Sequence, residues 1–256
     1  MISPLASIHP DARIGADVEI GPFTTISADV EIGEGSWIGP NVTIMDGARI
    51  GSNCRIFPGA VISAIPQDLK FQGERTTVEI GDRSTIRECV TINRGTKAYG
   101  KTVVGKDCLI MAYVHIAHDC ILGNHVILVN SVALAGHVEI GDYGIISGLS
   151  AVHQFVKIGA HVMIGGGAMV RKDVPPFITA AGEPLAYAGV NSVGLKRRNF
   201  AQEDIHEIQT LYRTMYQSGM NISQAVNQIK ETHPNRPLAD SILSFIEQSD
   251  RGLIRK

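Results

Sequence analysis

The sequence has little of what would place it in several common classes of protein. Only 5% of its 256 residues are aromatic, its four cysteines form no C-x-x-C pair, and its formal net charge is −2. A disulfide framework or a cysteine-ligated metal site is therefore not expected, and nucleic acid is a poor partner without a basic excess. No apolar run approaches the roughly 18 residues of a membrane span, and residues 1–4 do not open a signal peptide. We expect a soluble, cytoplasmic protein without membrane insertion.

What the sequence does contain is a repeat of six residues. From Ile2 to Val170, every sixth residue is Ile, Leu or Val, except at Asp68, Glu74 and Ala98. Small or β-branched residues, including three of the cysteines, often precede these aliphatics by two positions, and glycine often follows them. The period is neither that of a helix nor the simple alternation of a strand. It is typical of a parallel β-helix of short strands, in which three hexads form one triangular coil of 18 residues.

The repeat predicts a mainly β fold that continues into a helical domain. Residues 1–176 form the β-helix, and Pro175–Pro176 is its expected end, because proline cannot donate to a strand ladder. Helix-spaced apolar residues then indicate a C-terminal α-helical domain over residues 184–256. Its clearest helices are expected over residues 202–217, 222–232 and 238–248. Ser223 is a plausible N-cap of the second.

Two segments interrupt the hexads. Residues 63–79 and 93–103 lose the pattern, yet the phase resumes unchanged at Ile80 and Val104. They are interpreted as loops that leave the β-helix and return in register. Long loops on a rigid scaffold often carry function, although tolerated insertions would give the same pattern.

Stacking of the coils predicts which side chains meet, because residues 18 apart become neighbours on one ladder at about 4.8 Å. Four histidines then converge at one corner of successive coils: His115, His118, His137 and His153. Asp119 stacks with His137, and Gly136 stacks on His118. Imidazoles beside a carboxylate suit general-base catalysis, and a glycine N–H suits an oxyanion. No Ser or Cys of the cluster has a clear activating partner, so direct transfer is favoured over a covalent enzyme intermediate.

The histidine corner has other interpretations that the sequence also allows. Single polar residues at hexad turns are usually solvated, and a non-catalytic β-helix scaffold would need no cluster at all. Three histidines could also bind zinc, as in the γ-class carbonic anhydrases, which share this fold. Their spacing does not resemble that arrangement, and no metal site is assigned.

Five motifs carry a resemblance to one family: Pro66–Lys70, Ile116–Cys120, Leu134–Val138, Ala151–Phe155 and Gly194–Arg198. With them, essentially the whole chain resembles the acyl-carrier-protein:UDP-N-acetylglucosamine O-acyltransferases, which begin lipid A synthesis in Gram-negative bacteria. The resemblance implies left-handed β-helices in a homotrimer, with sites in the clefts between subunits. It also implies UDP-N-acetylglucosamine and phosphopantetheinylated acyl carrier protein as partners, the latter delivering an (R)-3-hydroxyacyl chain, and no other cofactor.

The resemblance also assigns roles to residues. His118 aligns with the general base that takes the proton of the sugar 3-hydroxyl, Asp119 with the residue that orients this base, and Gly136 with the oxyanion donor. By stacking alone, Asp119 could equally lie beside His137. The positions that match contacts to sugar, diphosphate or acyl chain are Asp68, Lys70, His115, His137, His153 and Gln154. Those that match the nucleotide end are Asn191, Arg197 and Arg198. Gly166 aligns with the floor of a groove that measures the acyl chain.

The nearest rival within the same fold is the N-acyltransferase that acts later in lipid A synthesis. That enzyme carries an additional N-terminal uridine-binding domain, whereas the hexads here begin at Ile2. The O-acyltransferase is therefore favoured. Lys196–Arg198 could also form a basic patch for the acidic carrier protein, since such patches raise the rate of encounter.

Overall fold

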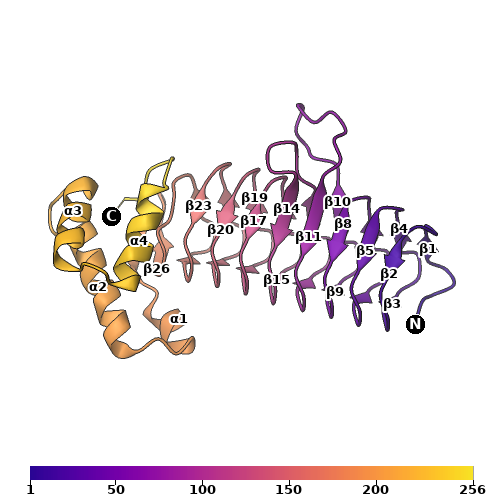
Figure 1. Ribbon diagram of the computed structural model, residues 1–256, viewed down its shortest axis with the longest axis horizontal. Helices are drawn as coiled ribbons and strands as arrows, with labels where there is room; N and C mark the ends of the chain where they lie inside the picture. Colours follow the sequence, from indigo (N-terminus) through magenta and orange to yellow (C-terminus); the bar gives the residue numbers. More distant parts are fainter. Residues whose placement is uncertain (256) are drawn as a thin grey trace.

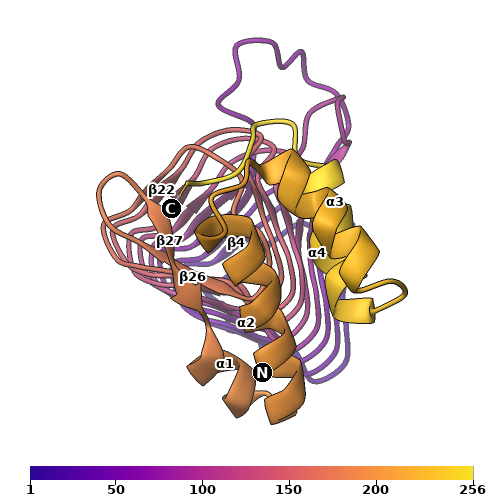
Figure 2. The ribbon, with the colours of Figure 1, turned by 90° about the vertical axis from the view of Figure 1, so that its left-hand side faces the viewer.

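The computed structural model describes residues 1–255, and most of them form a left-handed parallel β-helix (Figure 1). Successive short strands go to three different sheets in turn, so each sheet receives every third strand. Figure 2, a view along the prism, shows the coils superimposed and the helices gathered over one end. The fold class expected from the hexads is confirmed.

The sheets contain nine, eight and ten strands. In spatial order, the nine-stranded sheet consists of β1 (Ser7–Ile8), β4 (Thr25–Ile26), β7 (Thr43–Ile44), β10 (Val61–Ala64), β13 (Thr91–Asn93), β16 (His115–Ile116), β19 (Ala133–Leu134), β22 (Ala151–Val152) and β25 (Met169–Val170). The eight-stranded sheet consists of β2 (Arg13–Ile14), β5 (Val30–Ile32), β8 (Ala48–Ile50), β11 (Thr77–Ile80), β14 (Lys101–Val104), β17 (Ile121–Leu122), β20 (Glu139–Ile140) and β23 (Lys157–Ile158). The ten-stranded sheet consists of β3 (Glu19–Ile20), β6 (Trp37–Ile38), β9 (Arg55–Ile56), β12 (Thr85–Ile86), β15 (Leu109–Ile110), β18 (Ile127–Leu128), β21 (Ile145–Ile146), β24 (Met163–Ile164), β26 (Ile178–Ala181) and β27 (Ala186–Val190).

The core is a stack of the hexad aliphatics. Ile116 pairs with Leu134, which lies 18 residues further on, and both side chains are fully buried. Burying an aliphatic side chain of this size contributes about 1.5–3 kcal/mol, so the repeated column is the main source of stability. Cys54, Cys108 and Cys120 lie in the same core as free thiols, as the repeat predicts, whereas the free Cys89 is exposed.

The coils turn at corners where the backbone is left-handed. Asp119, His137 and Phe155 occupy successive coils of one corner with φ of 59°, 62° and 63°. Asp and His tolerate this conformation better than most residues, which suits them to such turns. Only the aliphatic positions are needed for the core, so the corner side chains remain available for a site.

Both predicted loops leave the prism between the same two sheets as this corner (Figure 1). Residues 65–76 connect β10 to β11, and residues 94–100 connect β13 to β14. The loops are shorter than expected because the flanking strands extend into them, with Thr77 pairing with Lys101. Ile80 pairs with Val104, so the register is preserved across both loops.

The prism ends one strand later than expected. β26 follows the two prolines, pairs in parallel with β24, and is joined by the antiparallel β27. The expected end at Pro175–Pro176 is therefore wrong. Pro176 lies in the turn that precedes β26, where its missing N–H costs no ladder hydrogen bond.

Four helices follow: α1 (Ser192–Arg197), α2 (Gln202–Gln217), α3 (Ile222–Thr232) and α4 (Pro237–Glu247). The buried Tyr212 hydroxyl of α2 donates to the Pro176 carbonyl oxygen at 2.6 Å and ties the helices to the prism. The sequence did not predict α1, and Ser223 is not the N-cap of α3. Asn221 caps it, accepting from the N–H of Gln224, whose side chain closes a capping box. No helix among the described residues combines the length and apolar character needed to cross a bilayer.

Candidate active site

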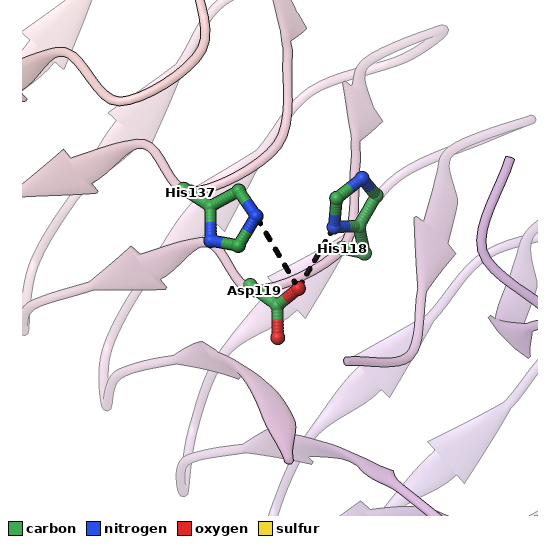
Figure 3. Close-up of side chains that lie close together, drawn as sticks. All are labelled: His118, Asp119 and His137. Carbon is green, nitrogen blue, oxygen red and sulfur yellow. Dashed lines mark hydrogen bonds and ion pairs between the residues drawn. The ribbon is translucent and has the colours of Figure 1, made fainter. Parts of the chain in front are cut away.

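Three side chains meet at one corner of the prism: His118, Asp119 and His137 (Figure 3). His118 and Asp119 lie between β16 and β17, and His137 lies between β19 and β20 on the next coil. Nδ1 of His118 lies 2.8 Å from Oδ2 of Asp119, whereas Nε2 of His137 lies 3.7 Å from the same oxygen. The first distance is a hydrogen bond and the second exceeds one. Stacking of the coils left the partner of Asp119 open, and these distances assign it to His118.

Asp119 is fully buried, but its carboxylate is well satisfied. Oδ2 accepts from the Thr96 hydroxyl at 2.7 Å, and Oδ1 accepts from the N–H groups of Thr96 at 3.0 Å and Tyr99 at 3.3 Å. Burial by itself raises the pKa of Asp119. The hydrogen bonds from His118 and Thr96, with His137 nearby, outweigh burial and hold this pKa below its ordinary value.

The ionised carboxylate determines the tautomer of His118. A carboxylate can only accept, so Nδ1 of His118 must carry the proton that it donates to Asp119. Nε2 of the neutral ring then keeps its lone pair. The side chain of His118 is 15% exposed and that of Asp119 is 0% exposed, so the base can be reached while its partner cannot.

Thr96 and Tyr99 were not identified from the sequence as residues of this site. They belong to residues 94–100, which lie outside the hexads, so stacking arithmetic does not apply to them. One feature of the sequence could have indicated them: this loop leaves the prism one coil before the corner that carries His118. The ring of Tyr99 also contacts His137 edge to face, with centroids 5.4 Å apart.

Gly136 passes directly over the ring of His118. A Cβ atom on Gly136 would lie 2.6 Å from Cε1 and 2.8 Å from Nε2 of His118, so no larger residue fits without displacing the ring. Within residues 1–255, no group accepts a hydrogen bond from the Gly136 N–H. The Gly136 N–H is therefore available as a hydrogen-bond donor.

The other two predicted histidines lie outside this group. His115 hydrogen-bonds through Nδ1 to the Thr91 hydroxyl at 2.7 Å, and its pKa is lowered by burial and by the nearby His118. His153 and Gln154 are exposed, and Nδ1 of His153 donates to the Gln154 carbonyl oxygen at 3.2 Å. The structure therefore brings His118, His137 and Asp119 together, with His115 close by, but it does not bring His153 into contact with them.

A hollow of about 160 Å³ opens beside His137, between the two loops. It is lined by Asp68, Lys70, Glu74, Thr96, Lys97, Ala98 and His137. Two of the predicted substrate contacts, Asp68 and Lys70, thus face the same space as His137. Burial lowers the pKa of His137, partly offset by Asp119, so a neutral imidazole borders the hollow at neutral pH.

The residues predicted at the nucleotide end lie at a different corner. Asn191 caps α1 through its side-chain oxygen, and its amide nitrogen donates to the His161 carbonyl oxygen at 2.9 Å. Arg198 lies over the ring of Tyr143, 5.0 Å from its centroid, and donates to the Tyr143 carbonyl oxygen. Arg197 is exposed. Asn191 therefore has a structural role that the sequence did not indicate.

Gly166 is exposed on the turn that follows β24. A Cβ atom there would meet nothing closer than the Gly148 carbonyl oxygen at 3.5 Å, an ordinary contact. A larger side chain at this position would therefore point into open space without forcing the backbone to move.

The corner group is also the one set of three His, Cys, Asp or Glu residues in the described chain that could surround a metal ion. Its ligand atoms lie within 4.8 Å of one another. Tetrahedral ligands held about 2.1 Å from a zinc ion lie roughly 3.4 Å from one another. The Asp119 oxygen and Nδ1 of His118, at 2.8 Å, would therefore have to move apart. Binding would also break the hydrogen bond between His118 and Asp119. The donor set is better suited to proton transfer than to a metal.

Comparisons with known proteins identify relatives of the whole chain. Residues 173–254 match the family described as Udp N-acetylglucosamine O-acyltransferase; Domain 2, and residues 29–64 and 101–136 match the bacterial transferase hexapeptide repeats. The chain is 53% identical over 262 residues to the acyl-(acyl-carrier-protein)–UDP-N-acetylglucosamine O-acyltransferase of Aliivibrio salmonicida, covering all of both chains. The enzyme of that name from Janthinobacterium is 50% identical over 260 residues, which cover 100% of this chain and 99% of that one. The crystal structure of a UDP-N-acetylglucosamine acyltransferase from Bacteroides fragilis matches over all of both chains with a TM-score of 0.98 and 52% identity.

Proposed function

The chain belongs to the family of acyl-(acyl-carrier-protein)–UDP-N-acetylglucosamine O-acyltransferases, which act in lipid A biosynthesis, and we propose that His118 is the general base of its reaction. The family expected from the sequence motifs is confirmed, and the chain is an enzyme that transfers an acyl group from acyl carrier protein to UDP-N-acetylglucosamine. The N-acyltransferase, the zinc protein and the non-catalytic scaffold are thereby set aside.

The observation that carries the assignment is the hydrogen bond between Nδ1 of His118 and the buried carboxylate of Asp119. This hydrogen bond orients the imidazole ring and leaves the lone pair of Nε2 available to the substrate. In the proposed step, Nε2 takes the proton of the sugar 3-hydroxyl while the hydroxyl oxygen attacks the thioester carbonyl. Asp119 stabilises the imidazolium that forms, because its negative charge lies 2.8 Å from Nδ1.

The tetrahedral intermediate places a negative charge on the former carbonyl oxygen. We assign the Gly136 N–H as its donor, supported by the position of Gly136 over Nε2 of His118. As the intermediate collapses, the C–S bond breaks and the proton on Nε2 passes to the departing phosphopantetheine thiolate. The enzyme itself forms no covalent bond to the acyl group, and no cofactor beyond the carrier protein's own phosphopantetheine is invoked.

The substrate contacts follow from the surroundings of this base. We assign Asp68, Lys70 and His137 to the sugar and its diphosphate, on the support of the shared hollow beside the base. His115, His153 and Gln154 border the path of the acyl donor, and the open position of Gly166 leaves room for a long acyl chain.

The site is incomplete in one subunit, and we propose a homotrimer with sites between subunits. The hollow of about 160 Å³ is smaller than the roughly 300–1,000 Å³ of ordinary ligand sites. Asn191, Arg197 and Arg198 lie at another corner, so they would reach the nucleotide of a substrate whose sugar lies at the His118 corner of a neighbouring subunit. The four free cysteines suit a reducing compartment, and we assign the enzyme to the cytoplasm.

The direct mechanism is tested by separating the substrates. The purified enzyme is incubated with (R)-3-hydroxyacyl carrier protein alone, and its intact mass is measured. It is then given UDP-N-acetylglucosamine, and the product is analysed by nuclear magnetic resonance. We expect no acylated enzyme and an ester at the sugar 3-hydroxyl. An acyl-enzyme that forms without the acceptor, or an ester at another hydroxyl, would refute the proposed chemistry.

A further inference from the structure

The loop of residues 94–100 is folded around one buried carboxylate. We propose that Thr96, on this loop, is a positioning residue of the acyl transfer: its hydroxyl fixes Asp119 and, through Asp119, the imidazole of His118. The inference rests on the proposed role of His118 as general base. Thr96 itself is 6% exposed and is not proposed to touch the reacting atoms.

The direction of the Thr96 hydroxyl proton follows from its two hydrogen bonds. Oγ1 accepts from the N–H of Ala98 at 3.2 Å, and it lies 2.7 Å from Oδ2 of Asp119. A hydroxyl has one proton, and the carboxylate cannot donate. Oγ1 of Thr96 therefore accepts from the Ala98 N–H through a lone pair and donates its own proton to Asp119.

The same oxygen of Asp119 serves both Thr96 and His118. Oδ2 accepts from the hydroxyl and from Nδ1 of His118, while Oδ1 accepts from the N–H groups of Thr96 and Tyr99. Donors at both oxygens prevent the carboxylate from rotating about its own axis. Because Asp119 is fully buried, water does not replace a donor that is removed.

The backbone around this contact is held at both ends. A Cβ atom on Gly95 would lie 2.3 Å from the backbone nitrogen of Lys101, so the start and end of the loop are in tight contact. The N–H of Asp119 donates to the Thr102 hydroxyl at 2.9 Å, just beyond the loop. Thr96 is therefore presented to Asp119 by a closed, anchored segment.

Loss of the hydroxyl would change the proton affinity of the His118–Asp119 pair. The charged or titratable groups that face the pair are His115 beside His118, His137 on the adjacent coil and, around the hollow, Asp68, Lys70, Glu74 and Lys97. Asp119 would remain buried with one donor fewer, so the pair would bind a proton at higher pH. The acid limb of kcat against pH would move upward.

The test compares Thr96→Val, which keeps the shape and loses both hydroxyl bonds, with Thr96→Ser, which keeps them. We expect the valine variant to lose roughly 10- to 100-fold in kcat, with the KM for UDP-N-acetylglucosamine within about 3-fold, and to show the shifted acid limb. The serine variant should match the wild type in rate and pH profile. A valine variant with the wild-type profile, or a serine variant as impaired as valine, would overturn the inference.

A double-mutant cycle separates positioning from a merely structural role. In an Asp119→Asn background, Thr96→Val should cost little further rate, because its target has already lost its charge. A full additional loss would overturn the inference. If the valine variant does not fold, Thr96→Cys, a weak donor of similar size, replaces it in the same comparisons. His118→Ala is assayed alongside: if it retains turnover, the proposed function fails, whereas an inactive His118→Ala with a normal Thr96→Val overturns the role of Thr96 alone.

Discussion

His118 and Asp119 are neighbours in sequence with opposite environments. Nδ1 of His118 lies 2.8 Å from Oδ2 of Asp119, and the side chains are 15% and 0% exposed, respectively. The left-handed backbone at Asp119, with φ of 59°, allows the carboxylate to lie beneath the loop while the adjacent imidazole stays accessible. One turn of the coil thus supplies both an accessible base and a buried partner that fixes its orientation.

Asp119→Asn should lower kcat strongly while preserving the fold. An amide is similar in shape to the carboxylate but is neutral, so it neither stabilises an imidazolium nor enforces the proton on Nδ1 of His118. We expect a loss of roughly 10²- to 10⁴-fold in kcat. Steady-state kinetics measure it, and the melting temperature and UDP-N-acetylglucosamine affinity serve as controls. A variant within a few-fold of the wild-type rate would show that the carboxylate does not support the base.

The repeat predicted which residues stack at this corner but not which hydrogen bonds they form. Stacking placed Asp119 with His137 and Gly136 on His118 because those neighbours depend only on the period. The choice between His118 and His137 as the partner of Asp119 depends on side-chain rotation and about 1 Å of distance, which a period does not encode. Thr96 was not predicted, since its loop follows no repeat and its position is set by tertiary contacts.

A shared site predicts complementation between inactive variants. His118→Ala removes the base from one corner, and Arg197→Ala with Arg198→Ala removes the basic residues at the other. If those residues serve a neighbouring subunit's base, co-refolding the two variants should regenerate sites with both elements and restore activity to a substantial fraction of wild type. Light scattering should give three times the chain mass of 27.5 kDa. A stable monomer, or mixed variants no more active than either alone, would count against sites between subunits.

His161 should make the fold sensitive to acid. Burial, together with the nearby Arg198, lowers the pKa of His161 to about 4. In the unfolded chain histidine takes up a proton near pH 6.5, so the free energy of unfolding should fall as the pH decreases from about 6.5 to 4. The ring stacks between Tyr143 and Phe177, so His161→Phe preserves the packing.

The comparison is made by thermal melting of the wild type and His161→Phe at pH 7 and pH 5. The phenylalanine variant should lose less of its melting temperature at pH 5. The same acid loss in both proteins would assign it to other groups, such as the histidines of the catalytic corner.

The C-terminal end of the β-helix and the N-terminus of α3 both differ from what residue type predicted. Two consecutive prolines usually terminate a ladder, but Pro176 coincides with a turn, where no donor is required, and β26 follows. Ser223 is a good N-cap by residue type, yet Asn221 precedes the helix and has Gln224 three residues later. The turn at Pro176 decided the first case and the capping box of Asn221 and Gln224 the second, so residue type alone was not sufficient.

Gly166→Met should shift the donor preference toward shorter acyl chains. The position is open, so a long side chain there would occupy the space assigned to the end of the acyl chain. Each buried methylene contributes about 0.8 kcal/mol, so excluding several should change the ratio of kcat/KM between long and short donors by orders of magnitude. Competition between donors of graded length measures this ratio within one enzyme preparation. An unchanged ratio would place the floor of the groove elsewhere.

Removal of the sugar hydroxyl proton by Nε2 of His118 is tested by the turnover number of His118→Ala. We expect a kcat lower by roughly 10²- to 10⁴-fold, with melting temperature and UDP-N-acetylglucosamine affinity close to the wild type, because His118 is not part of the aliphatic core. A His118→Ala enzyme that turns over within a few-fold of the wild type would show that another group, such as His137 or His115, is the base.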